Sequence, residues 1–209
     1  MTTVSILKQT YGYEVPILLK DIRIGGKSKT AIRKELSRAV ESGEITRKCN
    51  GVYCFTRDKS LGDTVTFDRI LTKKYVKDDF GINGFNTNVY GYYTGYTFIN
   101  WLGISAQVPA VPQITTNKTS CYREIKYRNR KAILYKSKAT INHENYKALQ
   151  FFEMFIWLSE DEYNANIDII FDYYKKNLTI RDLQYSKYFR GKCLDDFCNK
   201  CVDYEITRV

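Results

Sequence analysis

The chain has 209 residues, of which 44% are hydrophobic and 27% charged, and 33 Lys and Arg against 23 Asp and Glu give a net charge of +10. This size allows a small and a medium domain with real cores, and the basic balance favours an anionic partner. No stretch approaches the run of about 18 apolar residues that spans a membrane, and no charged-then-apolar leader opens the chain. We therefore expect a cytoplasmic protein with no membrane partner.

The first elements along the chain are expected to form a helix-turn-helix. The apolar run from Val15 to Ile22 predicts a short helix, which the glycines that follow it end. Ser28 is a good N-cap for a second helix, because its hydroxyl can accept a backbone N–H of the first turn. That helix is expected to continue to Glu41 with one apolar face, and Gly43 follows it as a left-handed cap.

A β-hairpin is expected next. The runs 45–49 and 52–56 are of β type, and the Asn50-Gly51 pair between them favours a type I′ turn, in which both residues have positive φ. Two helices followed by a hairpin is the order of a winged helix. The sequence therefore predicts a winged helix-turn-helix DNA-binding domain over residues 1–57.

The polar face of the second helix is basic. A basic helix fits the major groove of B-DNA, and a basic wing reaches the backbone or the minor groove. Residues 1–57 hold 11 Lys and Arg and 5 Asp and Glu, or +6 of the net +10, so the excess charge lies where the groove-facing helix is expected. A solvated face on a protein-interaction domain is the alternative. The predicted DNA contacts are Lys27, Ser28, Lys29, Thr30, Arg33, Lys34, Ser37 and Arg38 around the helix, with Arg47, Lys48 and Asn50 on the wing.

Residues 63–209 are expected to form a second, larger domain after a short link at 58–62. The predicted fold class is α+β, with a small sheet and a helical C-terminal tail. Residues 80–94 are expected to form a loop or a short strand. The expected helices cover 67–75, 94–103, 143–158, 161–176, 180–189 and 193–201, and the expected strands cover 111–116, 121–127 and 131–136.

Two features of this second domain could add contacts with nucleic acid. An aromatic cluster could stack on bases, although core packing is the favoured interpretation. Its members are Tyr90, Tyr92, Tyr93, Tyr96, Phe98 and Trp101. The hairpin 121–136 is basic and is either a second phosphate contact or a solvated surface. Its candidate residues are Arg123, Lys126, Arg128, Arg130 and Lys131.

The cysteines do not predict a metal site. Cys193, Cys198 and Cys201 have a C-x4-C-x2-C spacing, but a tetrahedral zinc site needs a fourth ligand, and His143, the one histidine of the chain, lies 50 residues upstream of Cys193. Reduced thiols packed on a C-terminal helix are the favoured interpretation. We expect no metal and no cofactor.

An enzymatic alternative comes from the E-x-K triplet formed by Glu124, Ile125 and Lys126 on a predicted strand. Metal-dependent nucleases with this triplet need another carboxylate on a neighbouring strand to hold Mg²⁺. No Asp or Glu occurs from Phe80 to Arg123. A metal-dependent nuclease with a winged-helix DNA-targeting domain is therefore kept as the alternative, and no catalytic residue is assigned.

One segment resembles a known family. Residues 95–125, GYTFINWLGISAQVPAVPQITTNKTSCYREI, are similar to the core of the abortive-infection AbiEi antitoxins. The shared elements are a small-residue helix, an LG-to-QVP segment, a strand with a Thr-containing turn, and a basic hairpin. The helix around Tyr146 and the N-terminal segment LSRAVESGEITRKCNGVYCF also resemble family segments, so the likeness covers about residues 5–158.

The resemblance implies a bacterial regulator from a two-gene toxin–antitoxin operon of type IV that acts in phage abortive infection. Such a protein binds inverted repeats in its own promoter and represses it. Its functional partner is a nucleotidyltransferase-like toxin, which it neutralises without a stable complex between the two proteins.

Overall fold

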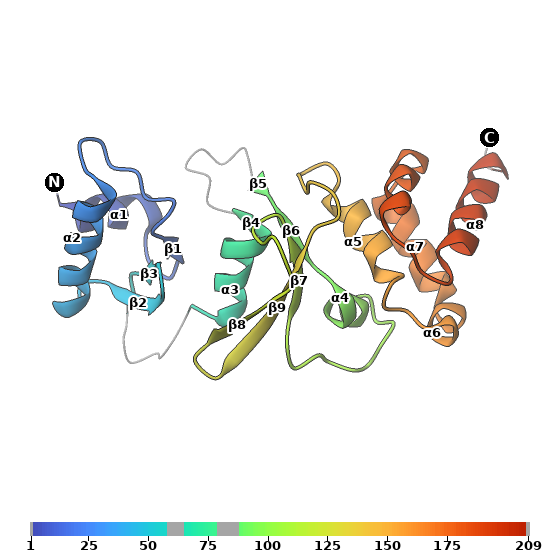
Figure 1. Ribbon diagram of the computed structural model, residues 1–209, viewed down its shortest axis with the longest axis horizontal. Coiled ribbons are helices and arrows are strands. Elements are labelled where there is room, and N and C mark those ends of the chain that lie inside the picture. Colours follow the sequence, from blue (N-terminus) through green and yellow to red (C-terminus); the bar gives the residue numbers. More distant parts are fainter. Residues whose placement is uncertain (1, 58–64, 79–87, 208–209) are drawn as a thin grey trace. The chain divides into compact units, whose positions relative to one another are not determined.

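A computed structural model of the protein describes residues 2–57, 65–78 and 88–207. It mixes helices with small sheets, which confirms the predicted α+β class (Figure 1). The chain divides into two compact units: unit 1 holds residues 1–74 and 78–87, and unit 2 holds residues 75–77 and 88–209. The predicted link at 58–62, and most of the predicted loop at 80–94, lie outside the described residues.

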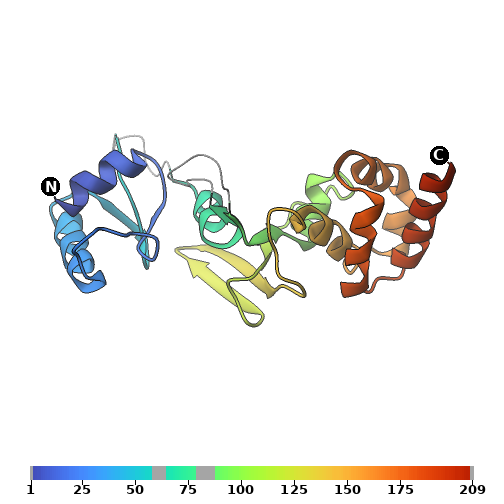
Figure 2. The same ribbon diagram turned by 90° about the horizontal axis from the view of Figure 1, so that it is seen from above.

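Unit 1 begins with two helices that pack on a three-stranded antiparallel sheet of order β1-β3-β2. Its elements are α1 (Thr3–Tyr11), β1 (Ile17–Leu18), α2 (Lys29–Glu41), β2 (Thr46–Cys49) and β3 (Val52–Cys54). Figure 2 shows α1 and α2 lying side by side. Their apolar faces meet the sheet in one core, which includes Leu7 of α1, Leu36 of α2 and Tyr53 of β3.

The predicted short helix over 15–22 is wrong. Ile17 and Leu18 form the strand β1 and pair with Tyr53 and Val52 of β3, while the first helix of the unit is α1. A short apolar run fits a buried strand as well as a helix. Pro16 also disfavours a helical conformation at Val15, since its ring collides with the residue before it.

The second predicted helix is confirmed as α2, including its ends. Ser28 Oγ accepts the backbone N–H of Ala31 at 3.1 Å, which satisfies one of the free donors at the helix start. Gly43, just after the helix, has a φ of 74°. That value lies in the left-handed region, which glycine adopts without strain because it has no Cβ.

The predicted hairpin is formed by β2 and β3, but its turn differs from the expected type I′. Only Gly51 of the two turn residues has a positive φ, of 71°. The register shifts between Arg47 and Cys49, which makes a β-bulge in β2. A bulge adds right-handed twist of its own, so the turn does not have to supply it.

The next elements along the chain are α3 (Phe67–Leu71), a π-helical turn η2 (Thr72–Val76), β4 (Lys77–Asp78) and β5 (Asn88–Val89). α3 belongs to unit 1 and β5 to unit 2. Thr66 caps α3, since its side chain accepts the backbone N–H of Arg69. The predicted helix over 67–75 is thus present, with a change of helix type after Leu71.

Unit 2 contains a four-stranded mixed sheet of order β6-β7-β9-β8. The strands are β6 (Gly91–Tyr93), β7 (Gln113–Thr116), β8 (Arg123–Tyr127) and β9 (Arg130–Lys136). β7 runs parallel to β9, and the other two pairs are antiparallel. All three strands predicted between 111 and 136 are present, with β8 and β9 forming the predicted hairpin.

Unit 2 also contains several helical elements. They are α4 (Gly95–Trp101), α5 (Tyr146–Met154), α6 (Glu160–Ala165), α7 (Ile167–Asn177), the 3₁₀ segment η3 (Ile180–Tyr188) and α8 (Leu194–Thr207). The helix predicted over 161–176 is two helices that meet at Asn166, and the helix predicted over 180–189 is η3. Within the described ranges, no helix is long and apolar enough to span a bilayer.

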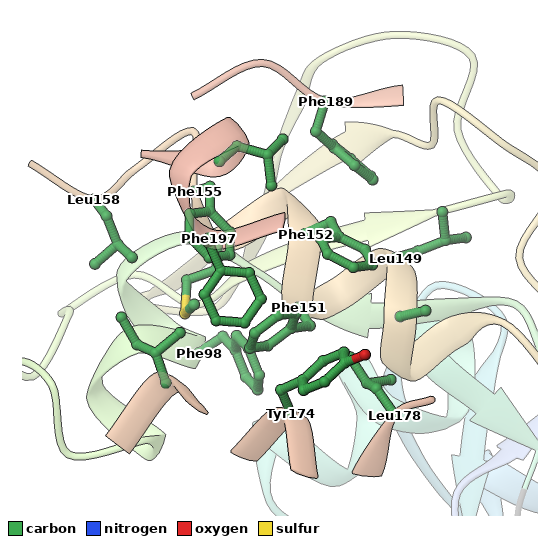
Figure 3. Close-up of a cluster of buried hydrophobic side chains, with 14 of the residues drawn as sticks. Phe98, Leu149, Phe151, Phe152, Phe155, Leu158, Tyr174, Leu178, Phe189 and Phe197 are labelled. Carbon is green, nitrogen blue, oxygen red and sulfur yellow. The ribbon is translucent and has the colours of Figure 1, made fainter. Parts of the chain in front are cut away.

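The core of unit 2 is aromatic and is centred on α5. Phe151 of α5 lies 5.3 Å from Phe197 of α8, measured between ring centroids (Figure 3). The ring centroid of Tyr173 of α7 lies 5.5 Å from that of Phe151. Tyr92 and Phe98 of the predicted aromatic cluster are also buried in this core. Core packing is therefore the role of the cluster's inner members.

The C-terminal cysteines are packing residues in this structure. Cys193 and Cys201 are buried in the same core, and Cys198 packs against it. Within the part of the chain that the structure describes, no group of three or more His, Cys, Asp or Glu side chains is placed to hold a metal ion.

Candidate nucleic-acid interface

One face of α2 gathers the residues predicted to contact DNA. Ile32, Leu36 and Ala39 are at most 4% exposed and fix the opposite face on the core of unit 1. The helix period then turns the intervening positions outward. The exposed polar residues of this face are Lys29, Thr30, Arg33, Lys34, Ser37 and Arg38.

The four cations of this face have no partner among the residues that the structure describes. Lys29, Arg33, Lys34 and Arg38 form no hydrogen bond or ion pair through their side chains with any described residue. Because nothing in the described structure neutralises them, their charge is available to phosphates, and the neighbouring hydroxyls of Thr30 and Ser37 are available to sugars or base edges.

Two predicted contacts at the start of the helix have roles inside the protein. Lys27 Nζ donates to Glu35 Oε1 at 2.7 Å and to Thr3 Oγ1 at 3.1 Å, so the structure makes it a tie between α1 and α2. The charge of Lys27 is paired within the protein, and its predicted contact with DNA stays a prediction. Ser28 is exposed, but its hydroxyl is occupied by the helix cap.

The β2–β3 hairpin, the predicted wing, has fewer exposed cations than predicted. Arg47 is exposed, and its Nη2 donates to Asn50 Oδ1 at 3.3 Å, which orders the side chain along the turn. Lys48 is only 8% exposed, and the prediction that it contacts DNA from the surface is wrong for this structure. Arg47 is exposed and Lys48 is buried, so the two cations do not share the outer face of the hairpin.

A basic pocket of about 300 Å³ lies beside α2 within unit 1. Lys29 and Arg33 line it from the helix, and Asn50 and Gly51 line it from the β2–β3 turn. The remaining lining residues are Leu18, Leu19, Lys20 and Lys74. The backbone N–H of Leu19 donates to Gly51 O at 2.9 Å, which holds the turn next to the end of β1. Lys20 and Lys74 were not singled out from the sequence, because only the fold brings them to this pocket.

The β8–β9 hairpin, yellow in Figure 2, contains the second predicted set of cations. Arg123, Lys126, Arg128, Arg130 and Lys131 are all exposed. Glu124 reduces their combined charge, since its Oε1 lies 3.7 Å from Lys126 Nζ and 3.3 Å from Lys131 Nζ. The net charge of the hairpin surface is therefore lower than the cation count suggests.

The same ion pairs bear on the E-x-K triplet. Glu124 is an exposed residue held between two lysines of its own hairpin. Among the described residues, Glu124 belongs to no group of three or more His, Cys, Asp or Glu side chains that could hold a metal ion, and the nuclease interpretation stays an untested alternative.

Comparison of the chain with protein-family models, with curated protein sequences and with solved structures finds no match.

Proposed function

We propose that unit 1 is a winged helix that binds double-stranded DNA, with α2 in the major groove and the β2–β3 turn at the backbone. The observation that carries this proposal is the exposed, unneutralised row of Lys29, Arg33, Lys34 and Arg38 on one face of α2. A helix with its apolar face fixed on a core and its basic face outward fits the width of the major groove.

The division of roles along this face follows from side-chain chemistry. Lys and Arg neutralise phosphates and give affinity that depends on salt, while Arg can also read guanine with two hydrogen bonds. Thr30 and Ser37 stand between them on α2. One small module reads few base pairs, so specific binding requires two copies of the chain on an inverted repeat.

We further propose that this DNA is the promoter of the chain's own operon. This step rests on the resemblance of residues 95–125 to the AbiEi antitoxins. The protein then acts in the cytoplasm as an autorepressor and counteracts a nucleotidyltransferase-like toxin. Unit 2 carries the antitoxin activity and adds phosphate contacts through the β8–β9 hairpin.

Footprinting on the DNA upstream of the gene tests the DNA-binding proposal directly. We expect protection of two symmetric half-sites by the full chain, and no protection by a variant in which Lys29, Arg33, Lys34 and Arg38 are all Ala. Co-expression with the neighbouring toxin gene tests the antitoxin proposal separately, by growth. Protection that survives the quadruple substitution contradicts the assignment of α2, and growth arrest despite the full chain contradicts the antitoxin role.

A further inference from the structure

The parallel strands of unit 2 end together at a pocket. Thr116 and Lys136, the last residues of β7 and β9, are register partners in the parallel pair. The segments that follow the two strands line a pocket of about 390 Å³. In open, mostly parallel α/β sheets, ligands bind beyond the carboxyl ends of the strands. The parallel β7–β9 pair of this mixed sheet places two loops in the same way. A volume of this size falls in the range of small-ligand sites.

The lining of the pocket is cationic and polar. It consists of Thr116, Asn117, Thr119, Lys136, Ser137, Lys138, Ala139 and Thr140. No carboxylate is among these residues, and neither lysine is ion-paired with a described residue. Lys138 Nζ lies 5.1 Å from the centroid of the Phe189 ring, which positions the ammonium group without removing its charge. The pocket therefore complements an anion.

The loop after β9 is held in place from two sides. Asn117 donates from Nδ2 to Ile141 O at 2.8 Å and accepts from Ile141 N at 3.1 Å through Oδ1. Asn145, at the start of α5, donates from Nδ2 to Thr140 O at 2.9 Å. These bonds form the pocket before any ligand enters, which lowers the entropic cost of binding.

This loop also leaves backbone donors unused. The N–H groups of Lys138, Ala139 and Thr140 make no hydrogen bond with another described group. A free backbone N–H can donate a hydrogen bond to an anion, and the two ammonium groups nearby add charge-assisted donors.

We propose that this pocket binds a phosphate group, held by Lys136, Lys138 and the backbone N–H groups of residues 138–140. A phosphate has enough acceptor oxygens for both kinds of donor, and the pocket leaves room for the molecule that carries it. The site belongs to unit 2 and does not depend on DNA binding by α2. Its phosphate comes either from a free nucleotide or from a DNA backbone, and the two sources are separated by experiment.

Isothermal titration of the full chain tests the proposal, with inorganic phosphate and then AMP as probes at constant ionic strength. The parent chain carries Lys29→Ala and Arg33→Ala, so that the pocket of unit 1 does not contribute. Lys136→Ala with Lys138→Ala is expected to weaken binding on the order of tenfold or more, because the variant lacks two charge-assisted donors. The matched control, Lys147→Ala with Lys176→Ala, removes the same charge from exposed helix positions of unit 2 and is expected to bind like the parent.

A second arm measures duplex DNA binding by the chain with α2 intact. If AMP binds saturably, and Lys136→Ala with Lys138→Ala weakens AMP binding but leaves DNA affinity unchanged, the pocket is assigned to a nucleotide. A fall of about two units in the salt slope of DNA binding in the same variant, without saturable AMP binding, assigns it to backbone phosphates. Two results would overturn the proposal. One is that the parent and the pocket variant bind phosphate, AMP and DNA equally well. The other is that neither AMP nor phosphate binds saturably and the salt slope of DNA binding is unchanged.

Discussion

Lys27 Nζ donates to both carboxylate oxygens of Glu35, at 2.7 and 2.8 Å. The same carboxylate accepts the backbone N–H of Thr3 at 3.3 Å, so the pair ties the start of α1 to the middle of α2. The hydrogen bonds from Lys27 and Thr3 lower the pKa of Glu35 to about 2. The orientation of the basic face of α2 therefore depends on a carboxylate that stays charged over most of the pH range.

Replacing Glu35 by Gln should make unit 1 less stable and less sensitive to acid. A lowered pKa in the folded state means that the unfolded chain binds more protons, so this carboxylate stabilises the fold above pH 4.5 and loses that effect as the pH falls toward about 2. Hydrogen exchange of the α2 backbone amides from pH 6 to pH 3 measures this pH-dependent stability. The variant should exchange faster near pH 6 and approach the wild type near pH 3, and parallel pH profiles would count against the tie.

The quadruple Ala substitution of Lys29, Arg33, Lys34 and Arg38 should abolish specific DNA binding. Each side chain that neutralises a phosphate should lower the salt slope by about one unit when it is removed. Removal of a side chain that contacts a base edge should cost about 1–3 kcal/mol of binding free energy at one base pair of the DNA site. Gel shifts over a salt series measure both quantities.

The chain offers a matched control for this experiment. Lys147, Lys176, Arg181 and Arg190 are exposed in the helical part of unit 2, and replacing them by Ala removes the same two Lys and two Arg charges. The control should keep most of the affinity. If both quadruple variants lose binding equally, net charge and not the α2 face determines affinity.

Gly51→Ala should destabilise unit 1 through the backbone and not through a clash. An added Cβ would have Leu19 Cβ at 3.9 Å as its nearest neighbour, so there is room for it. The φ of 71° is the unfavourable feature, and the left-handed conformation costs about 1–2 kcal/mol for a residue with a Cβ. Urea unfolding followed by far-UV circular dichroism measures the loss. Gly51→Asn should lose less, because Asn tolerates this region, and equal stability of all three proteins would disprove the explanation.

How much of unit 1 the sequence could predict depends on the range of each interaction. α2 has its cap, its apolar face and its terminal glycine within 16 residues, so local pattern was sufficient. β1 could not be told from a helix, because the partner that makes it a strand is β3, with Ile17 opposite Tyr53. The burial of Lys48 and the pairing of Lys27 with Glu35 likewise come from tertiary contacts.

The candidate sites show the same limit. The exposed row on α2 follows from helical period alone, and all six of its predicted residues are exposed. The phosphate pocket of unit 2 was not predicted, because it requires the parallel register that places Thr116 beside Lys136. Twenty residues separate these two positions along the chain, and no local pattern encodes which strands pair.

Phe151→Ala should be among the most destabilising substitutions in unit 2. The ring is fully buried and lies within 5.6 Å of Phe152, Phe155 and Phe197, measured between centroids. Removing a buried Phe side chain and leaving the cavity costs about 3–5 kcal/mol. Both tryptophans of the chain, Trp101 and Trp157, belong to unit 2, so tryptophan fluorescence during urea unfolding reports this unit by itself. A fall in the free energy of unfolding of less than about 1 kcal/mol, as for a conservative substitution, would mean that the core collapses into the cavity.

Glu153→Gln should stabilise unit 2 at neutral pH. Glu153 is 6% exposed, and burial raises the pKa of its carboxyl, although the hydroxyls of Thr115, Tyr92 and Thr94 lower it in part. Because the folded state holds this proton more tightly, the carboxyl favours folding most below pH 4.5, and its contribution falls as the pH rises from 4.5 to the raised pKa. The Gln amide keeps the shape and never carries the charge.

Tryptophan-detected unfolding should give a higher urea midpoint for Glu153→Gln than for the wild type at pH 7, with the difference closing near pH 4. Glu144→Gln, which removes an exposed carboxylate near α5, is the control and should show no such difference. A midpoint for Glu153→Gln at or below that of the wild type at pH 7 would mean that the buried carboxylate is stabilised by its hydroxyl neighbours more than it is penalised by burial.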